Sequence, residues 1–189
     1  MKKINSYELP KKLIIKLTEL FNKRKFQEIK KEIPILIKTY PESFFLWNIK
    51  GAVEVSMGDS IDAIKSFKTV IEINPNYSDA HNNLGIILQK NGDLKEAIKS
   101  YERALNIDPK YPECLNNLGV TYKELKKYDS AIRCYKKAIG LDPNYYEAYN
   151  NLAVVYQLKG DLDLAIKNFQ NAINLNSTFS KAISQMLHL

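Results

Sequence analysis

The sequence predicts an all-α protein in which one pair of antiparallel helices is repeated along most of the chain. Three observations predict this fold. Prolines recur every 34 residues, at Pro41, Pro75, Pro109 and Pro143. The segments that follow them align without gaps, and each unit contains two stretches with apolar residues at helical spacing. One helix pair cannot bury its own apolar faces, so we expect the pairs to stack into a solenoid.

The first helix of each unit carries the clearest motif. Ser-Asp-Ala-His-Asn-Asn-Leu-Gly at 78–85 matches Pro-Glu-Cys-Leu-Asn-Asn-Leu-Gly at 112–119 and Tyr-Glu-Ala-Tyr-Asn-Asn-Leu-Ala at 146–153. A divergent version lies at 44–51. The second helix follows a short turn and begins at a residue such as Asp93, with Glu96 three residues later. This spacing is typical of a capping box at a helix start.

Small residues recur at fixed places in both helices, and aromatic residues recur beside them. The small residues are Gly51, Gly85, Gly119 and Ala153 in the first helix and Ala63, Ala97, Ala131 and Ala165 in the second. The aromatic residues are Phe67, Tyr101, Tyr135 and Phe169. We expect the small residues to let the two helices approach closely and the rings to fill the space beside them.

This pattern resembles the tetratricopeptide-repeat (TPR) family, in which small, aromatic and proline residues share a 34-residue period. The family numbering divides a single domain, 1–189, into repeats 10–43, 44–77, 78–111, 112–145 and 146–179, and 180–189 begin a further first helix. The resemblance implies a right-handed superhelical solenoid whose first helices line a concave surface. It also implies a scaffold that binds a protein or peptide and has no enzymatic activity.

Two repeats depart from the pattern. Repeat 10–43 has Leu17 in place of the small residue and Ile29 in place of the alanine, and Pro34 falls inside its second helix. We interpret it as a degenerate capping repeat. Repeat 112–145 has Lys126 and Lys127 at the turn where others have Gly or Gly-Asp, so we expect different turn chemistry there.

The resemblance implies that positions 2, 5, 6, 9, 12 and 13 of each first helix face the concave side. Position 5 holds Asn48, Asn82, Asn116 and Asn150, position 6 holds Asn83, Asn117 and Asn151, and position 9 holds Ile86, Val120 and Val154. A primary amide offers two donors and an acceptor, so it can pair with the N–H and C=O groups of an extended chain. We therefore predict that the asparagines, position 6 ahead of position 5, hold a peptide backbone. Solvated asparagines of the general repeat pattern remain the alternative.

The same residues favour or disfavour other classes of partner. The paired asparagines also resemble the TPR superhelix of O-linked N-acetylglucosamine transferases and their bacterial relatives, which implies a substrate-recruitment module of a larger enzyme. The TPR clamp for carboxylate-ended tails needs bases where this chain has Asp79, Glu113 and Glu147. Residues 1–43 carry 11 Lys or Arg against 5 Asp or Glu, which leaves nucleic-acid binding through the basic first repeat as a less favoured alternative.

No arrangement of residues predicts catalysis, a metal site, a cofactor or a small-molecule substrate. His81 is at core position 4, where a structural histidine is expected, and Cys114 and Cys134 have no His near them in sequence. Tyr77, Tyr111, Tyr145 and Phe179 share position 34, which indicates packing between repeats. No signal peptide and no apolar run long enough to span a membrane is present, so a cytoplasmic protein without membrane contact is predicted.

The last ten residues contain an apolar face. Ile183, Met186 and Leu187 fall at positions 4, 7 and 8, which pack inside earlier repeats, and the second helix that would cover them is missing. We expect either self-association or continuation of the chain through 180–189.

Overall fold

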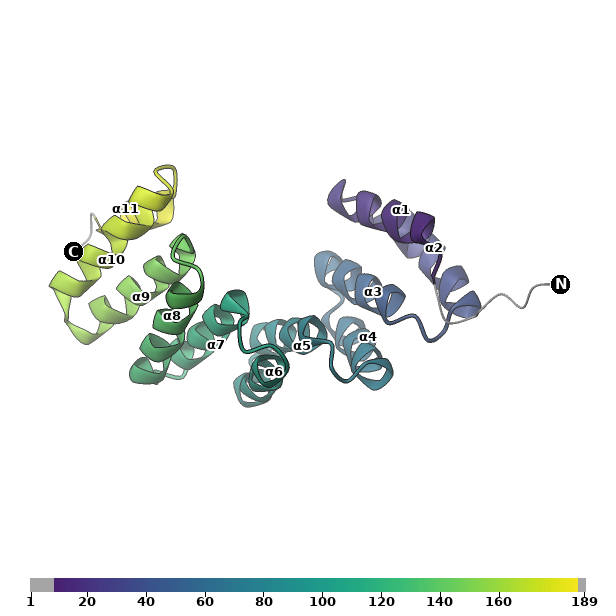
Figure 1. Cartoon of the computed structure of the whole chain (residues 1–189), viewed down its shortest axis with the longest axis horizontal. Helices are drawn as coiled ribbons and strands as arrows, with labels where there is room; N and C mark the ends of the chain where they lie inside the picture. The colour runs from purple at the N-terminus through teal and green to yellow at the C-terminus, as the bar shows by residue number, and fades with distance from the viewer. Residues whose placement is uncertain (1–8, 187–189) are drawn as a thin grey trace. The chain divides into compact units, whose positions relative to one another are not determined.

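The computed structural model describes residues 9–186, apart from the side chain of Lys181, and all regular structure in that range is α-helical (Figure 1). The helices are α1 (Lys11–Asn22), α2 (Phe26–Thr39), α3 (Phe44–Met57), α4 (Ser60–Ile73), α5 (Ser78–Lys90), α6 (Leu94–Ile107), α7 (Pro112–Glu124), α8 (Tyr128–Leu141), α9 (Tyr146–Lys159), α10 (Leu162–Leu175) and α11 (Ser180–Met186). The all-α prediction is confirmed. No helix of this described part is long and apolar enough to cross a membrane.

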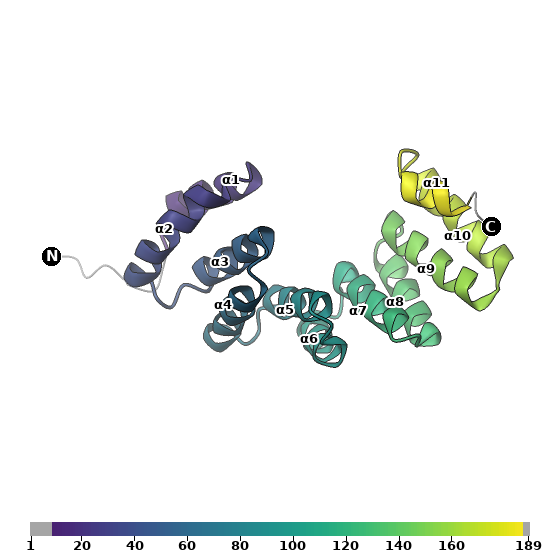
Figure 2. The same cartoon turned by 180° about the vertical axis from the view of Figure 1, so that it is seen from behind.

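The chain divides into two compact units, residues 1–93 and 94–189, and the division falls at the turn inside repeat 78–111. The first unit contains α1 to α5 and the second contains α6 to α11. Within the units, α3 packs closely on α4, α7 on α8, and α9 on α10, as both views show (Figures 1 and 2). Each of these pairs is one predicted repeat, and each is joined by a turn of only a few residues.

Within the units, the centre of the α3–α4 and α7–α8 pairs is a contact between a glycine and an aromatic ring. Phe67, Tyr101, Tyr135 and Phe169 are all 1% exposed or less. A Cβ added at Gly51 would lie 2.8 Å from Phe67, and one added at Gly119 would lie 2.6 Å from Tyr135. Such distances are below any ordinary van der Waals contact, so glycine is needed here for close approach rather than for its backbone freedom.

In the core of the degenerate first repeat, large and small residues have exchanged positions relative to the other repeats. Leu17 and Ile29 stand where the other repeats have small residues, and Ile33 stands where they have a ring. These three side chains are 0%, 0% and 2% exposed. Two larger residues therefore replace two small ones while a smaller residue replaces the ring, and such volume-conserving changes keep a core well packed. Pro34 lies within α2, which continues from Phe26 to Thr39.

The turns within the repeats share one backbone conformation although their residues differ. Gly58, Gly92 and Gly160 have φ of 86°, 87° and 84°. Arg24 and Lys126 have φ of 54° and 58°, in the same left-handed region. The turn of repeat 112–145 thus differs from the others in its residues but not in its geometry. A side chain with a Cβ is strained in this conformation by about 1–2 kcal/mol.

In two repeats the ring at position 34 packs against the ring at position 1 of the same repeat, which is a contact within one repeat rather than the predicted contact between repeats. Phe44 and Tyr77 have ring centroids 5.1 Å apart, and Tyr146 and Phe179 have centroids 4.9 Å apart. Burial raises the pKa of the Tyr77 hydroxyl to about 12.

The last helix, α11, packs against α10. Ala182 is fully buried there, and Ile183 and Met186 are half-buried. Leu187, the third residue of the predicted apolar face, lies outside the described residues. Self-association through this segment stays a prediction.

Two glycines of α7 and α8 are expected to respond to alanine in opposite ways. Gly119→Ala should destabilise the protein by about 1–3 kcal/mol because the new methyl group overlaps the buried Tyr135 ring. Gly140→Ala should stabilise it by about 0.5–1 kcal/mol, since a Cβ there meets nothing within 4 Å and restricts the unfolded chain. Urea unfolding followed by circular dichroism measures both, and shifts of the same sign would contradict the packing argument.

Replacing the strained residue at the fourth turn should stabilise the protein. Lys126→Gly removes the Cβ from a residue with φ of 58°, which relieves about 1 kcal/mol of strain. Lys127→Gly, at the neighbouring residue with φ of −84°, is the control and should not raise the unfolding midpoint. Equal midpoints for the two variants in urea would show that the turn is not strained.

Candidate functional site

The rings at position 4 of the first helices have a structural role in the first unit. The indole Nε1 of Trp47 donates to the carbonyl oxygen of Pro41 at 2.8 Å, and the Nε2 of His81 lies 3.1 Å from the carbonyl oxygen of Pro75. Both carbonyl groups belong to the proline near the end of the preceding repeat. His81 is only 8% exposed, so the prediction of a satisfied structural histidine is confirmed.

The two cysteines are buried and free. Burial raises the pKa of the Cys114 thiol to about 12 and that of the Cys134 thiol to about 11. Both thiols are therefore protonated at neutral pH, and a protonated thiol is a poor nucleophile and a poor metal ligand. Over residues 9–186, no group of three or more His, Cys, Asp or Glu side chains could hold a metal ion.

The predicted asparagines fall into two classes of burial. At position 5, Asn82, Asn116 and Asn150 are buried, with exposed fractions of 5%, 7% and 1%, whereas Asn48 is half-buried. At position 6, Asn83, Asn117 and Asn151 are all half-buried. The apolar residues at position 9, Ile86, Val120 and Val154, are also half-buried. A ligand that approaches from solvent therefore meets positions 6 and 9 before position 5.

A hydrogen bond between repeats connects the two positions in the second unit. The Nδ2 of Asn151 donates to the Oδ1 of Asn116 at 2.9 Å, across the interface between α9 and α7. Position 6 of one repeat thus bonds position 5 of the repeat before it, and we call this bond the amide rung. By register, Asn150 and Gln185 occupy the same two positions one repeat later, and their side-chain oxygens are buried without a hydrogen-bond partner.

A pocket of about 220 Å³ opens in the first unit among predicted groove positions. Its lining residues are Phe21, Ala52, Val55, Ser56, Phe67, Asn83 and Ile86. All of them except the core ring Phe67 fall at positions 6, 9, 12 or 13 of their repeats. We call it the groove pocket. Phe21 was not among the predicted site residues because the first repeat departs from the family pattern, although Phe21 occupies position 12 of that repeat.

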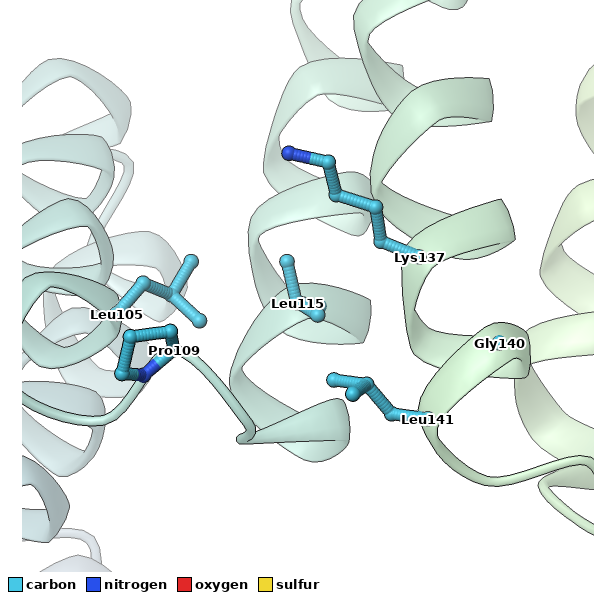
Figure 3. Close-up of a pocket in the computed structure, with 6 residues that line it drawn as sticks. All are labelled: Leu105, Pro109, Leu115, Lys137, Gly140 and Leu141. Carbon is cyan, nitrogen blue, oxygen red and sulfur yellow. The ribbon is translucent and has the colours of Figure 1, made fainter.

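A second cavity, of about 390 Å³, lies in the other unit (Figure 3). It is lined by Leu105, Pro109, Leu115, Lys137, Gly140 and Leu141. Two residues, one of them smaller than its counterpart in another repeat and the other a glycine, explain the cavity. Leu115 occupies position 4, which holds a ring in Trp47, and Gly140 has no side chain at all. The cavity is therefore a consequence of local underpacking, and it includes none of the predicted site residues.

The basic first repeat neutralises part of its own charge. Lys16 pairs with Glu32 at 2.6 Å and Lys25 with Glu28 at 2.7 Å. Lys23 lies 4.0 Å from Glu19. These pairs are exposed, so each contributes little stability. They nevertheless leave fewer cations for a phosphate backbone than the residue count alone suggests.

The helix pairs and their repeated core define a helical-repeat protein. Family models assign residues 76–144 and 146–179 as tetratricopeptide repeat and residues 51–92 as TPR repeat. Together these matches span more than half of the chain, which belongs to the tetratricopeptide-repeat family. The predicted family and solenoid fold class are thereby confirmed. No curated protein matches the chain in sequence.

Solved structures agree with this family assignment. A crystal structure of MamA has a TM-score of 0.76 at 24% identity and covers 86% of this chain and 95% of that one. MamA 41-end from Desulfovibrio magneticus RS-1 gives 0.78 at 20% identity, with 89% and 96% covered. YrrB, described as a TPR protein with an unusual peptide-binding site, gives 0.72 at 18% identity, with 89% and 87% covered. At these identities the likeness shows the fold alone.

The amide rung should make a measurable contribution to stability. Asn151→Ala leaves the buried Oδ1 of Asn116 without a donor, which should cost about 1–3 kcal/mol. Asn116→Ala with Asn151→Ala should cost less than the sum of the two single changes, because both remove the same bond. Urea unfolding of the four proteins in this cycle measures the coupling, and strict additivity would mean that the bond contributes nothing.

Proposed function

We propose that this protein is a non-catalytic scaffold that holds an extended segment of a partner polypeptide along the groove-facing positions of its first helices. The groove pocket is the observation that supports this most directly. Six side chains from three first helices line one pocket, and all six fall at positions that the family resemblance assigns to the concave surface. A common surface built from successive repeats is how solenoid proteins bind extended chains.

The pocket suggests how such a segment would be held. Phe21, Ala52 and Ile86 give it apolar walls, and Asn83 supplies an amide at its edge. A volume of about 220 Å³ suits one side chain rather than a whole small molecule, since ligand pockets usually measure about 300–1,000 Å³. We infer that an apolar side chain enters the pocket while the Asn83 amide pairs with the neighbouring peptide backbone.

Peptides selected from a displayed library of random linear dodecamers provide a probe for this proposal. Ala52→Trp fills the groove pocket and should weaken the selected peptides by tenfold or more, as judged by fluorescence anisotropy. Asn83→Ala removes one amide and should weaken them by about fivefold, which corresponds to the roughly 1 kcal/mol of one hydrogen bond. Neither change should lower the melting temperature by more than a few degrees.

Ile61→Trp is the matched control because Ile61 is 73% exposed on α4, outside the groove pocket. It should leave peptide affinity unchanged. If the selected peptides bind the Ala52→Trp protein as tightly as the wild type, the groove pocket is not where they bind.

A further inference from the structure

A polar network lies on the first unit at Lys50 and Glu54, where the three following repeats have Leu at position 7 and Leu or Tyr at position 11. The Nζ of Lys50 lies 2.6 Å from Oε1 of Glu54 and 2.9 Å from Oγ of Ser66. The Ser66 hydroxyl donates to the other carboxylate oxygen of Glu54 at 2.6 Å. The Glu54 side chain is only 12% exposed and Ser66 is fully buried. The three groups hydrogen-bond to one another in a site that is largely shielded from water.

In repeat 146–179, the positions of Lys50 and Glu54 hold apolar and aromatic residues. Lys50 and Glu54 hold positions 7 and 11 of repeat 44–77. In repeat 146–179 these positions hold Leu152 and Tyr156, which are 3% and 7% exposed and belong to the core of the second unit. The face of α3 that should pack as core therefore carries an ion pair instead. A folded core does not require this replacement, because apolar residues at such positions are often at least as stabilising as a buried ion pair.

A pocket of about 190 Å³ lies directly over this network. It is lined by Ile29, Lys30, Ile33, Pro34, Lys50, Val53 and Glu54, from α2 and α3. Positions 7, 10 and 11 of a helix lie opposite positions 9 and 12, so this pocket faces away from the groove pocket. We call it the back pocket. Pro34 has no N–H, so the carbonyl group of Lys30 lacks the donor that an ordinary helix would supply four residues later.

We propose that the back pocket is a second docking site, which takes one large apolar side chain from an acidic segment of a partner polypeptide. Ile29, Ile33 and Val53 give it apolar walls, and its volume fits a single anchor residue. The Lys50–Glu54–Ser66 network is already satisfied, so an apolar group can cover it without leaving a charge unpaired. The carbonyl group of Lys30 can accept an N–H, which favours a tryptophan indole among the large side chains.

The sign of the partner's charge follows from the surroundings. Residues 9–43, which include α1 and α2, carry nine Lys or Arg against four Glu. Lys30 lines the pocket itself, and it forms an exposed ion pair with Asp59 at 3.4 Å, which is screened by solvent. Opposite charge on a partner speeds its encounter with such a surface and disfavours basic competitors. A nucleic acid would also be attracted to the charge, but it offers no side chain that would need the apolar cavity.

The test uses three acetylated pentapeptides with amidated ends, in which tryptophan is flanked by four glutamates, tryptophan by four lysines, or alanine by four glutamates. Each is titrated into the whole protein with carbon-13-labelled isoleucine methyl groups. The glutamate–tryptophan peptide should shift the Ile29 and Ile33 signals saturably and leave Ile86, in the groove pocket, unshifted. The lysine and alanine peptides should bind at least tenfold more weakly.

Two variants decide whether the cavity itself binds. Lys50→Leu with Glu54→Tyr fills the back pocket with the residues that repeat 146–179 has at these positions. This double change should abolish the shifts without lowering the melting temperature. Lys30→Glu, an exposed change that does not depend on repacking, should weaken the glutamate–tryptophan peptide and strengthen the lysine–tryptophan peptide. Ala52→Trp, in the groove pocket, should change neither.

Four outcomes would overturn the proposal. The filled variant could bind the glutamate–tryptophan peptide as tightly as the wild type, Lys30→Glu could leave the charge preference unchanged, or the shifts could map to Ile86 instead. Binding of the alanine peptide with the same affinity would likewise show that only charge is recognised and that the cavity takes no part.

Discussion

Close approach of two helices at one small residue is the constraint on which the rest of this structure depends. At Gly119 the neighbouring Tyr135 ring occupies the space that a Cβ would need. The ring can be fully buried only because the backbone of the first helix lies directly against it. That fixes the distance between the two helices of a repeat. The 34-residue period gives repeat 44–77 the same contact, between Gly51 and Phe67.

The first repeat shows that the constraint concerns volume rather than particular residue types. Leu17 and Ile29 occupy space that other repeats leave to a ring, and Ile33 takes up correspondingly less. The repeat stays packed, but its second helix is no longer a copy of the others. Pro34 in that helix and the ion pair on the facing side of α3 lie at the junction where the exceptional repeat meets the regular ones. The back pocket is located at this junction.

The repeat register predicted the helix pairs and the family, because both follow from the spacing of residue types. The groove positions were implied by the family resemblance and stay a prediction. The register could not predict which of two identical neighbouring residues is buried. Asn116 and Asn117 are identical in chemistry, yet only Asn116 is buried, since that depends on the angle at which the next repeat packs. It also could not predict that Lys126 adopts the glycine conformation, because the shared helix geometry on either side imposes that turn. The back pocket could not be predicted from spacing either, because it depends on how Lys50 and Glu54 of α3 meet Ser66 of α4.

The amide rung changes how the asparagines at positions 5 and 6 should be understood. A rung that bonds Asn151 to Asn116 gives these residues a structural role, which is the alternative that their general occurrence in the repeat pattern suggested. The two roles are compatible for position 6. An amide that is already held by one hydrogen bond has fewer rotamers to lose when a ligand binds, and immobilising a free side chain costs about 0.5–1.5 kcal/mol. A rung that fixes the amide in advance therefore favours recognition of a peptide backbone, provided that its second N–H and its oxygen remain accessible from the groove.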